Sequence, residues 1–195
     1  MAEALHTLIV YGSVRQDRQG IGLARFLGRH IDARGGTSEL ADPLELQLPL
    51  LDRMYKEYAA GEAPEAMQRM ASMIARADAV LIVSAEYNHG IPPALKNLLD
   101  HFLEEWLWRP AGIACYSAGR FGGVRAAMQL RMTLGELGMP TISSLLPVPE
   151  IGKTVALDGT VQQDWLPSAT DRFLDELFWW AEAARTQKRA QGVPF

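Results

Sequence analysis

The sequence predicts an α/β protein built on a doubly wound, five-stranded parallel sheet with helices on both faces. Short apolar runs typical of buried parallel strands alternate along the chain with longer segments whose apolar residues recur at helical spacing. Small or polar residues directly follow the first three clear runs, at positions where such sheets bind ligands. The alternation of strand and helix favours parallel strands joined by crossover helices.

Five segments are expected to form the strands. Three are short, strongly apolar runs, and a weaker run follows them. A further strand fits between the first two runs, although Asp42 and Pro43 interrupt its pattern. The expected strands cover residues 5–11, 38–46, 79–83, 111–116 and 142–148.

Five helices are expected to separate and follow these strands. Pro64 suits the first turn of one helix, and Gly138 suits the stop position of another. The expected helices cover residues 20–33, 64–77, 92–106, 123–137 and 165–185. Residues 51–63 form the longest expected loop. Because the chain shows no linker or repeat, residues 1–195 are expected to form a single domain.

Composition narrows the range of partners and compartments. A formal net charge of -4, without a basic run, argues against nucleic acid or an anionic membrane as a partner. The single cysteine, Cys115, lies in an apolar run, which predicts a buried side chain rather than a nucleophile. No signal-peptide pattern and no apolar run of about 20 residues is found. A cytoplasmic location without membrane attachment is therefore expected.

The loop at residues 12–22, after the first strand, predicts an anion site. The start of the following helix offers backbone N–H groups and the positive end of the helix dipole. A hydroxyl and two guanidinium groups suited to phosphate oxygens come from Ser13, Arg15 and Arg18. Gly20 and Gly22 allow close approach of a ligand. A dinucleotide G-x-G-x-x-G loop is less favoured because Arg25 stands at its third glycine, and a solvated basic loop stays open.

The loop at residues 84–93 suits the edge of a planar heterocycle. It combines a carboxylate, an aromatic ring, an amide and an imidazole, and two prolines then open a helix. Backbone N–H groups along this turn would meet ring heteroatoms, and Tyr87 would stack on or flank the ring. Two alternatives stay open: an acid–base pair of Glu86 and His89, or a purely structural polar turn. A metal at His89 is disfavoured because no other ligand types show suitable spacing.

The loop at residues 117–123 looks like a G-x-S-x-G nucleophile elbow without its first glycine. Hydrolases of that kind place a histidine after the serine in the chain. Every histidine of this chain precedes Ser117, which excludes that order. We therefore expect a small-residue loop that packs against a flat ligand, with a structural strand-to-helix turn as the alternative.

Together the three loops resemble those of the NADPH-dependent FMN reductases, a flavodoxin-like family that includes quinone, azo-dye and chromate reductases. The family's G-S-x-R phosphate loop is matched by GSVRQDRQG. Its P-E-Y-N-x-x-x-P-x-x-L-K-N segment, the most specific of the three, is matched by SAEYNHGIPPALKNLLD. Its third, flavin-flanking loop is matched by YSAGRFGGVRAAMQLR. The resemblance covers nearly the whole chain and implies a flavodoxin-like sheet with strand order 2-1-3-4-5.

The resemblance implies a role for each matching residue. The FMN phosphate would be held by Ser13, Arg15, Arg18, Gly20, Ile21 and Gly22. The isoalloxazine ring would be bordered, largely through backbone, by Glu86, Tyr87, Asn88, His89 and Gly90. The other side of the ring would be flanked by Ser117, Ala118, Gly119 and Gly122. Ala85 replaces the family's proline, so the backbone before Glu86 is less rigid.

The activity implied is that of an NAD(P)H-dependent FMN oxidoreductase. Hydride would pass from NADPH or NADH to N5 of FMN, and two electrons would then reduce a small acceptor. Quinones, flavins, azo compounds and metal oxyanions all remain open as acceptors. No side chain has to act as a nucleophile or metal ligand, so no catalytic or metal residue is predicted. A flavodoxin-type electron carrier and a dinucleotide-binding protein without flavin are the alternatives.

The resemblance further implies a homodimer or homotetramer with the flavin near the subunit interface. Members of the family commonly pair through the helix expected here at residues 92–106. Trp106 and Trp108 are therefore candidate interface anchors, with the protein's own core as the alternative location. By the same resemblance, residues 51–58 would cover a partner's flavin.

Overall fold

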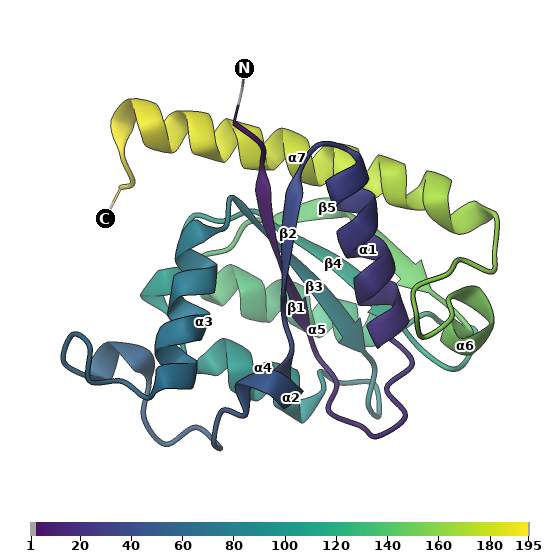
Figure 1. Cartoon of the computed structure of the whole chain (residues 1–195), viewed down its shortest axis with the longest axis horizontal. Coiled ribbons are helices and arrows are strands. Elements are labelled where there is room, and N and C mark those ends of the chain that lie inside the picture. Colours follow the sequence, from purple (N-terminus) through teal and green to yellow (C-terminus); the bar gives the residue numbers. More distant parts are fainter. Residues whose placement is uncertain (1–2, 195) are drawn as a thin grey trace.

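The computed structural model describes residues 3–194 and contains one sheet of five parallel strands. The strands follow the order β2-β1-β3-β4-β5, which confirms the expected topology (Figure 1). Their bounds are His6–Tyr11 for β1, Thr37–Ala41 for β2, Ala79–Ala85 for β3, Ala111–Tyr116 for β4 and Thr141–Val148 for β5. Every residue of β3 and β4 is buried, which explains why both segments are continuous runs of apolar or small residues.

Helices cover both faces of this sheet (Figure 1). One face is covered by α1 (Ile21–Ala33) and α7 (Trp165–Gln191), and the other by α3 (Glu65–Arg76), α4 (Pro93–Asp100) and α5 (Val124–Glu136). The short helices are α2 (Pro43–Leu46), α6 (Ile151–Thr154) and the 3-10 turns η1 (Tyr55–Glu57) and η2 (Glu104–Trp106). Within residues 3–194, none of these helices is long and apolar enough to span a bilayer.

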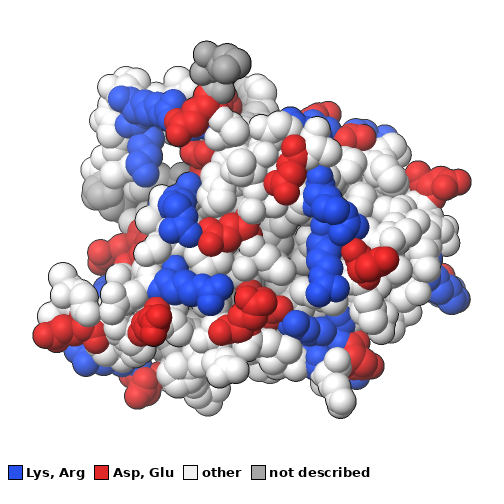
Figure 2. Space-filling model, viewed as in Figure 1, with Lys and Arg blue, Asp and Glu red and all other residues white. Residues whose placement is uncertain are grey.

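Side chains of β1 alternate between two hydrophobic clusters. Leu8 and Val10 pack with α3, α4 and α5, whereas Ile9 and Tyr11 pack with α1 and α7. All four side chains are at most 1% exposed, because both faces of the sheet are covered. On the surface, acidic and basic side chains are interspersed over the face shown in Figure 2.

The second strand is shorter than expected. It ends at Ala41 rather than at residue 46, because Asp42 caps the short helix α2 and Pro43 occupies the first helical position. The Asp42 carboxylate accepts a hydrogen bond from the Leu44 N–H at 3.0 Å. The two residues that interrupt the strand pattern are therefore the start of a helix.

The helix expected at residues 92–106 is divided in two. The first part, α4, ends after Asp100. There the His101 carbonyl accepts a hydrogen bond from the Tyr55 N–H at 2.8 Å instead of one from the next turn of a helix. Trp106 is fully buried and donates from its indole N–H to the Leu99 carbonyl at 3.1 Å. Its predicted role as an interface anchor is therefore wrong, since the side chain belongs to the protein's own core. Trp108 is 37% exposed.

Candidate functional site

The loops after β1, β3 and β4 meet in one cavity at the carboxyl edge of the sheet. The strand register sets Tyr11 beside Val83 and Ala85 beside Tyr116, so the three strands end close together. The cavity has a volume of about 210 Å³. It is lined by Ser13, Arg15, Asp17, Arg18, Gln19, Ala85, Glu86, Tyr87, Tyr116, Ser117, Ala118 and Ile151.

Each of the three predicted loops contributes to this lining. The predicted residues found there are Ser13, Arg15, Arg18, Glu86, Tyr87, Ser117 and Ala118. The remaining predicted residues do not line the cavity and belong to the same loops or to the first turn of α1: Gly20, Ile21, Gly22, Asn88, His89, Gly90, Gly119 and Gly122. The individual ligand contacts of both sets stay predictions.

Three hydroxyl-bearing side chains, Ser13, Tyr87 and Tyr116, line the cavity, and the fully buried Tyr11 lies next to Tyr116. The Ser13 and Tyr87 hydroxyls are 2.8 Å apart, and those of Tyr11 and Tyr116 are 3.1 Å apart. Burial raises the pKa of both Tyr11 and Tyr116, so these phenols stay neutral and act as hydrogen-bonding groups. Neither tyrosine is among the predicted site residues, although each is the last residue of a buried strand at the ligand-binding edge.

The two arginines of the first loop have different surroundings. The Arg15 side chain is 64% exposed, and it pairs at 3.4 Å with the carboxylate of Asp17, which is 71% exposed. Arg18 is only 20% exposed and donates to both carboxylate oxygens of the buried Asp42, at 2.5 and 2.6 Å. Arg15 is therefore free to meet an anion, whereas Arg18 fastens the loop to the start of α2.

The start of α1 is packed more tightly than the anion-site prediction assumes. The N–H groups of Ile21 and Gly22 donate to the carbonyls of Arg18 and Gln19 at 3.1 and 3.2 Å. A Cβ at Gly20 would lie 2.0 Å from the ring of Tyr116. The lack of a side chain at Gly20 therefore serves packing inside the protein.

The second loop is a tight two-residue turn. Tyr87 and Gly90 exchange backbone hydrogen bonds of 3.0 and 2.9 Å, and both Asn88 and His89 have positive φ. Consecutive positive φ values are the geometry of a type I′ turn, which Asn tolerates well. The Gln129 amide donates to the His89 carbonyl at 3.1 Å and ties the turn to α5. Both central side chains are exposed.

Glu86 links the second loop to the start of α5. Its carboxylate accepts hydrogen bonds from the N–H groups of Arg125 and Ala126 at 2.9 and 3.2 Å, and from the Arg125 guanidinium at 3.2 Å. Burial acts to raise the pKa of Glu86, but these hydrogen bonds outweigh it and lower that pKa. The ionised side chain thus satisfies free donors at the positive end of α5. An acid–base role with His89 is disfavoured by this engagement.

The third loop is fastened to α6. The Ile151 N–H donates to the Ser117 carbonyl, and the Glu150 N–H donates to the Gly119 carbonyl, both at 3.0 Å. The Ser117 hydroxyl donates to the Gly119 carbonyl at 2.8 Å, so it is not poised as a nucleophile. Ala118 and Gly119 stay exposed at the rim of the cavity.

Comparison with known proteins identifies the family. The family model described as NADPH-dependent FMN reductase matches residues 5–152, which is most of the chain. The chain belongs to the NADPH-dependent FMN reductase family. A quinone reductase of Pseudomonas putida is 30% identical over 95% of this chain and 99% of its own length. An NAD(P)H-dependent FMN reductase of Saccharomyces cerevisiae is 30% identical over 73% of this chain and 84% of its own length.

Solved structures agree with this assignment. The flavoenzyme NAD(P)H:(acceptor) oxidoreductase FerB of Paracoccus denitrificans superposes with a TM-score of 0.72 at 25% identity, covering 90% of this chain and 98% of its own. An NAD(P)H:quinone oxidoreductase of Methanothermobacter marburgensis, at 16% identity and a TM-score of 0.57, shares the fold. The chain is accordingly an NAD(P)H-dependent oxidoreductase that uses FMN, as the loop motifs indicate.

The cavity of this FMN reductase family member offers two kinds of surface. Ser13, Arg15 and Gln19 offer hydroxyl, guanidinium and amide donors suited to a phosphate. Tyr87 and Ala118 offer apolar surface suited to a flat ring system. The donor set therefore fits a phosphorylated flavin.

Cys115 takes no part in this site. It is fully buried in β4, and burial raises the pKa of its thiol to about 12. The prediction of a buried, unreactive cysteine is confirmed.

Proposed function

We propose that the cavity binds FMN with its phosphate against Ser13 and Arg15 and its ring between Tyr87 and Ala118. The convergence of all three predicted loops on one cavity at the carboxyl edge of the sheet is the observation that carries this proposal. In this proposal the protein oxidises NAD(P)H and reduces a quinone. The quinone reductase of Pseudomonas putida, similar over almost its full length, supports that acceptor class.

In the proposed complex the two arginines of the first loop have different roles. Arg15 supplies charge directly to the phosphate, because nothing buried holds its guanidinium in place. Arg18 acts through the backbone, because its ion pair with Asp42 fixes the loop that carries Ser13 and Arg15. This differs from the sequence-based expectation, in which both arginines bind the phosphate.

Bound FMN supplies the hydride-accepting and electron-releasing chemistry. The protein's part is to hold the ring in place and leave one side open. The turn at Asn88 and His89 presents backbone along one edge, and Glu86 holds that turn against α5. Ala118 and Gly119 are small and exposed, which leaves room above the cavity for a nicotinamide or a flat acceptor in turn.

The division between the two arginines is tested by ligand titration of the apoprotein. We expect Arg15→Met to weaken FMN binding about tenfold while riboflavin, which has no phosphate, binds as it does to the wild type. Arg18→Met is expected to weaken both ligands, because it loosens the loop. Arg69→Met removes an exposed arginine that does not line the cavity and serves as the matched control. Equal loss of FMN and riboflavin in Arg15→Met would contradict the phosphate assignment.

The acceptor is tested with the FMN-loaded protein. Steady-state oxidation of NADPH and of NADH is followed with a benzoquinone, free FMN, an azo dye and chromate as alternative acceptors. We expect the highest kcat/KM with the quinone. A higher value with any of the other three would reject the quinone and reassign the acceptor.

We also propose that a second copy of the chain covers an apolar hollow beside the flavin cavity. This hollow of about 260 Å³ is lined by Val14, Pro43, Leu46, Leu48, Leu50, Pro93, Ala94, Asn97 and Leu98. Leu50 is 84% exposed, and Val14, next to Ser13, is 44% exposed. Burying these side chains against a second copy would remove apolar surface from water and favour a dimer. We expect Leu50→Glu to shift the mass measured by light scattering from dimer to monomer. A wild-type monomer at micromolar concentration would refute the pairing.

A further inference from the structure

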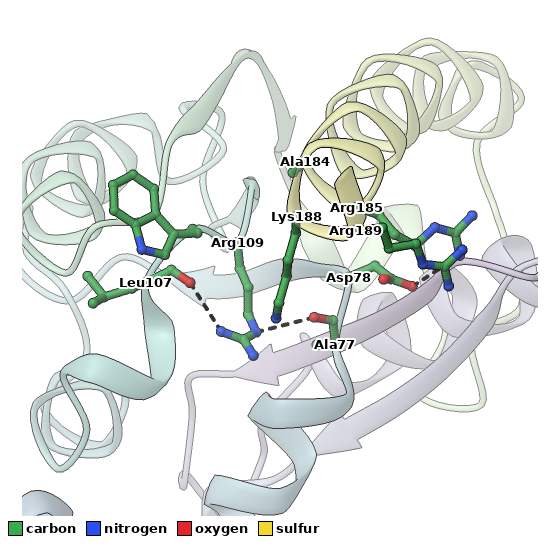
Figure 3. A pocket seen from close by; sticks show the side chains of 9 residues that line it. Ala77, Asp78, Leu107, Arg109, Ala184, Arg185, Lys188 and Arg189 are labelled. Carbon is green, nitrogen blue, oxygen red and sulfur yellow. Dashed lines mark hydrogen bonds and ion pairs between the residues drawn. The ribbon is translucent and has the colours of Figure 1, made fainter. Parts of the chain in front are cut away.

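A second cavity lies at the opposite, amino-terminal edge of the sheet. It has a volume of about 370 Å³ and lies between the last turns of α7, the start of β3 and the segment before β4 (Figure 3). It is lined by Ala77, Asp78, Leu107, Trp108, Arg109, Ala184, Arg185, Lys188 and Arg189. We call this cavity the basic groove. Eight residues of extended chain separate Asp78 from Glu86, so the two cavities are roughly 25 Å apart.

The basic groove carries more positive than negative charge. Four of its lining side chains are cationic, and Asp78 is the single acidic one. Arg185 pairs with Asp78 and Glu182, and Arg189 pairs with Glu3. For Arg109 and Lys188, no carboxylate among residues 3–194 lies within ion-pair distance. Two cations that form no ion pair within the described chain thus share one cavity.

Arg109 is held rigidly by carbonyl groups. Its guanidinium donates to the carbonyls of Ala77, Glu105 and Leu107 at 3.2, 2.6 and 3.1 Å, and to that of Ala75 at 3.4 Å. Four of its five N–H donors are thereby used, and no carboxylate of the described residues accepts a hydrogen bond from it. Burial lowers the pKa of Arg109, and the negative charges of Asp78 and Glu105 offset only part of this effect. Figure 3 shows Lys188 reaching from α7 toward the same region of the groove.

The base of the groove contains an incompletely paired guanidinium. The Arg185 side chain is 8% exposed, and its Nε has no hydrogen-bond acceptor in the described chain. A buried N–H donor without a partner costs free energy. Because this Nε is covered by protein atoms, Arg185 adds positive charge to that of Arg109 and Lys188 and no further donor to the groove.

We propose that the basic groove is a binding site for a small phosphate monoester. Phosphate oxygens accept hydrogen bonds from ammonium and guanidinium groups and compensate their charge. The cavity volume lies within the range of small-molecule sites and exceeds what one oxyanion needs. Leu107 and Ala184 give the remaining space an apolar wall for the ester's organic part.

Isothermal titration calorimetry of the FMN-loaded protein with phenyl phosphate at low ionic strength tests this proposal. Loading with FMN keeps the phosphate loop at Ser13 occupied, so the titration reports on other sites. We expect binding that inorganic phosphate competes with and that phenol does not reproduce. Lys188→Met is expected to weaken this binding about tenfold, and Lys188→Arg to retain it. Lys56→Met, which removes an exposed lysine from η1, is the matched control and should bind as the wild type does.

Two results would overturn the proposal. One is the absence of binding heat with the wild type at millimolar phenyl phosphate. The other is equal affinity of the wild type and Lys188→Met, which would place the phosphate elsewhere. Lys188 is exposed near the end of α7, so its replacement should not impair folding, and circular dichroism of the variant checks this.

Discussion

Replacing Glu86 by alanine tests how the second loop is held against the start of α5. The carboxylate accepts two backbone N–H bonds at the start of α5 and one bond from Arg125, and its side chain is only 9% exposed. Hydrogen bonds to a charged group contribute about 1.5 to 3 kcal/mol each, but bonds to one carboxylate do not add fully. We therefore expect Glu86→Ala to lower the free energy of unfolding by about 3 kcal/mol.

For a chain of this length each kcal/mol lowers the melting temperature by roughly 2 to 4 °C, so a shift of about 9 °C is expected. Circular dichroism melts of the apoprotein measure it. Glu136→Ala, which removes an exposed carboxylate from the other end of α5, is the matched control and should leave the melting temperature nearly unchanged. A loss below 1 kcal/mol in Glu86→Ala, or an equal loss in the control, would refute the proposed anchor.

The contribution of Glu86 should also depend on pH. Its pKa is lowered in the folded protein, so its stabilising effect is complete above the unfolded value of about 4.3. That effect is lost as the pH falls through the lower folded pKa. The difference in stability between wild type and Glu86→Ala should therefore shrink below about pH 4, and a constant difference would point to packing alone.

Three further predictions concern other parts of the fold. Glu176 accepts bonds from Ser143 and Ser144, which outweigh its desolvation and lower its pKa to about 2. Glu176→Gln should therefore lower the free energy of unfolding at pH 7 by about 2 kcal/mol, a value reduced to allow for solvent screening. Urea unfolding measures this loss, which should be much smaller at pH 2. Gly20→Ala should displace the ring of Tyr116 and weaken FMN binding in a fluorescence titration, unlike Gly61→Ala in an exposed loop. Cys115 should resist a thiol reagent in the folded protein at pH 8 and react fully in urea; rapid labelling of native protein would contradict its burial.

Much of the fold follows from local patterns. Runs such as β3 and β4 are apolar because both faces of the sheet are covered, so their positions are readable without a structure. The end of β2 is harder to place. In the sequence pattern Asp42 only interrupts a strand, whereas in the structure it caps the helix α2. The break after α4 depends on a hydrogen bond from Tyr55, which lies far away in the sequence. Contacts of that kind leave no local signature.

The three loops that form the site could be predicted from the sequence, but the hydrogen bonds and ion pairs within the site could not. Ser13, Tyr87 and Ser117 stand where strands end, and a parallel sheet brings such positions together. The pairing of Arg18 with Asp42 and of Glu86 with α5 depends on side-chain directions that spacing does not encode. The class of ligand can therefore be predicted from the sequence more easily than the side chains that contact it.

The most direct test of the central claim is an anaerobic titration of the purified, FMN-reconstituted protein with NADPH and, in parallel, NADH, followed by absorbance. We expect bound flavin to show its band near about 450 nm and to lose it with about one equivalent of at least one nicotinamide cofactor, then to regain it on addition of a quinone. Failure to retain FMN, or a flavin band that persists with both cofactors, would contradict the proposed function.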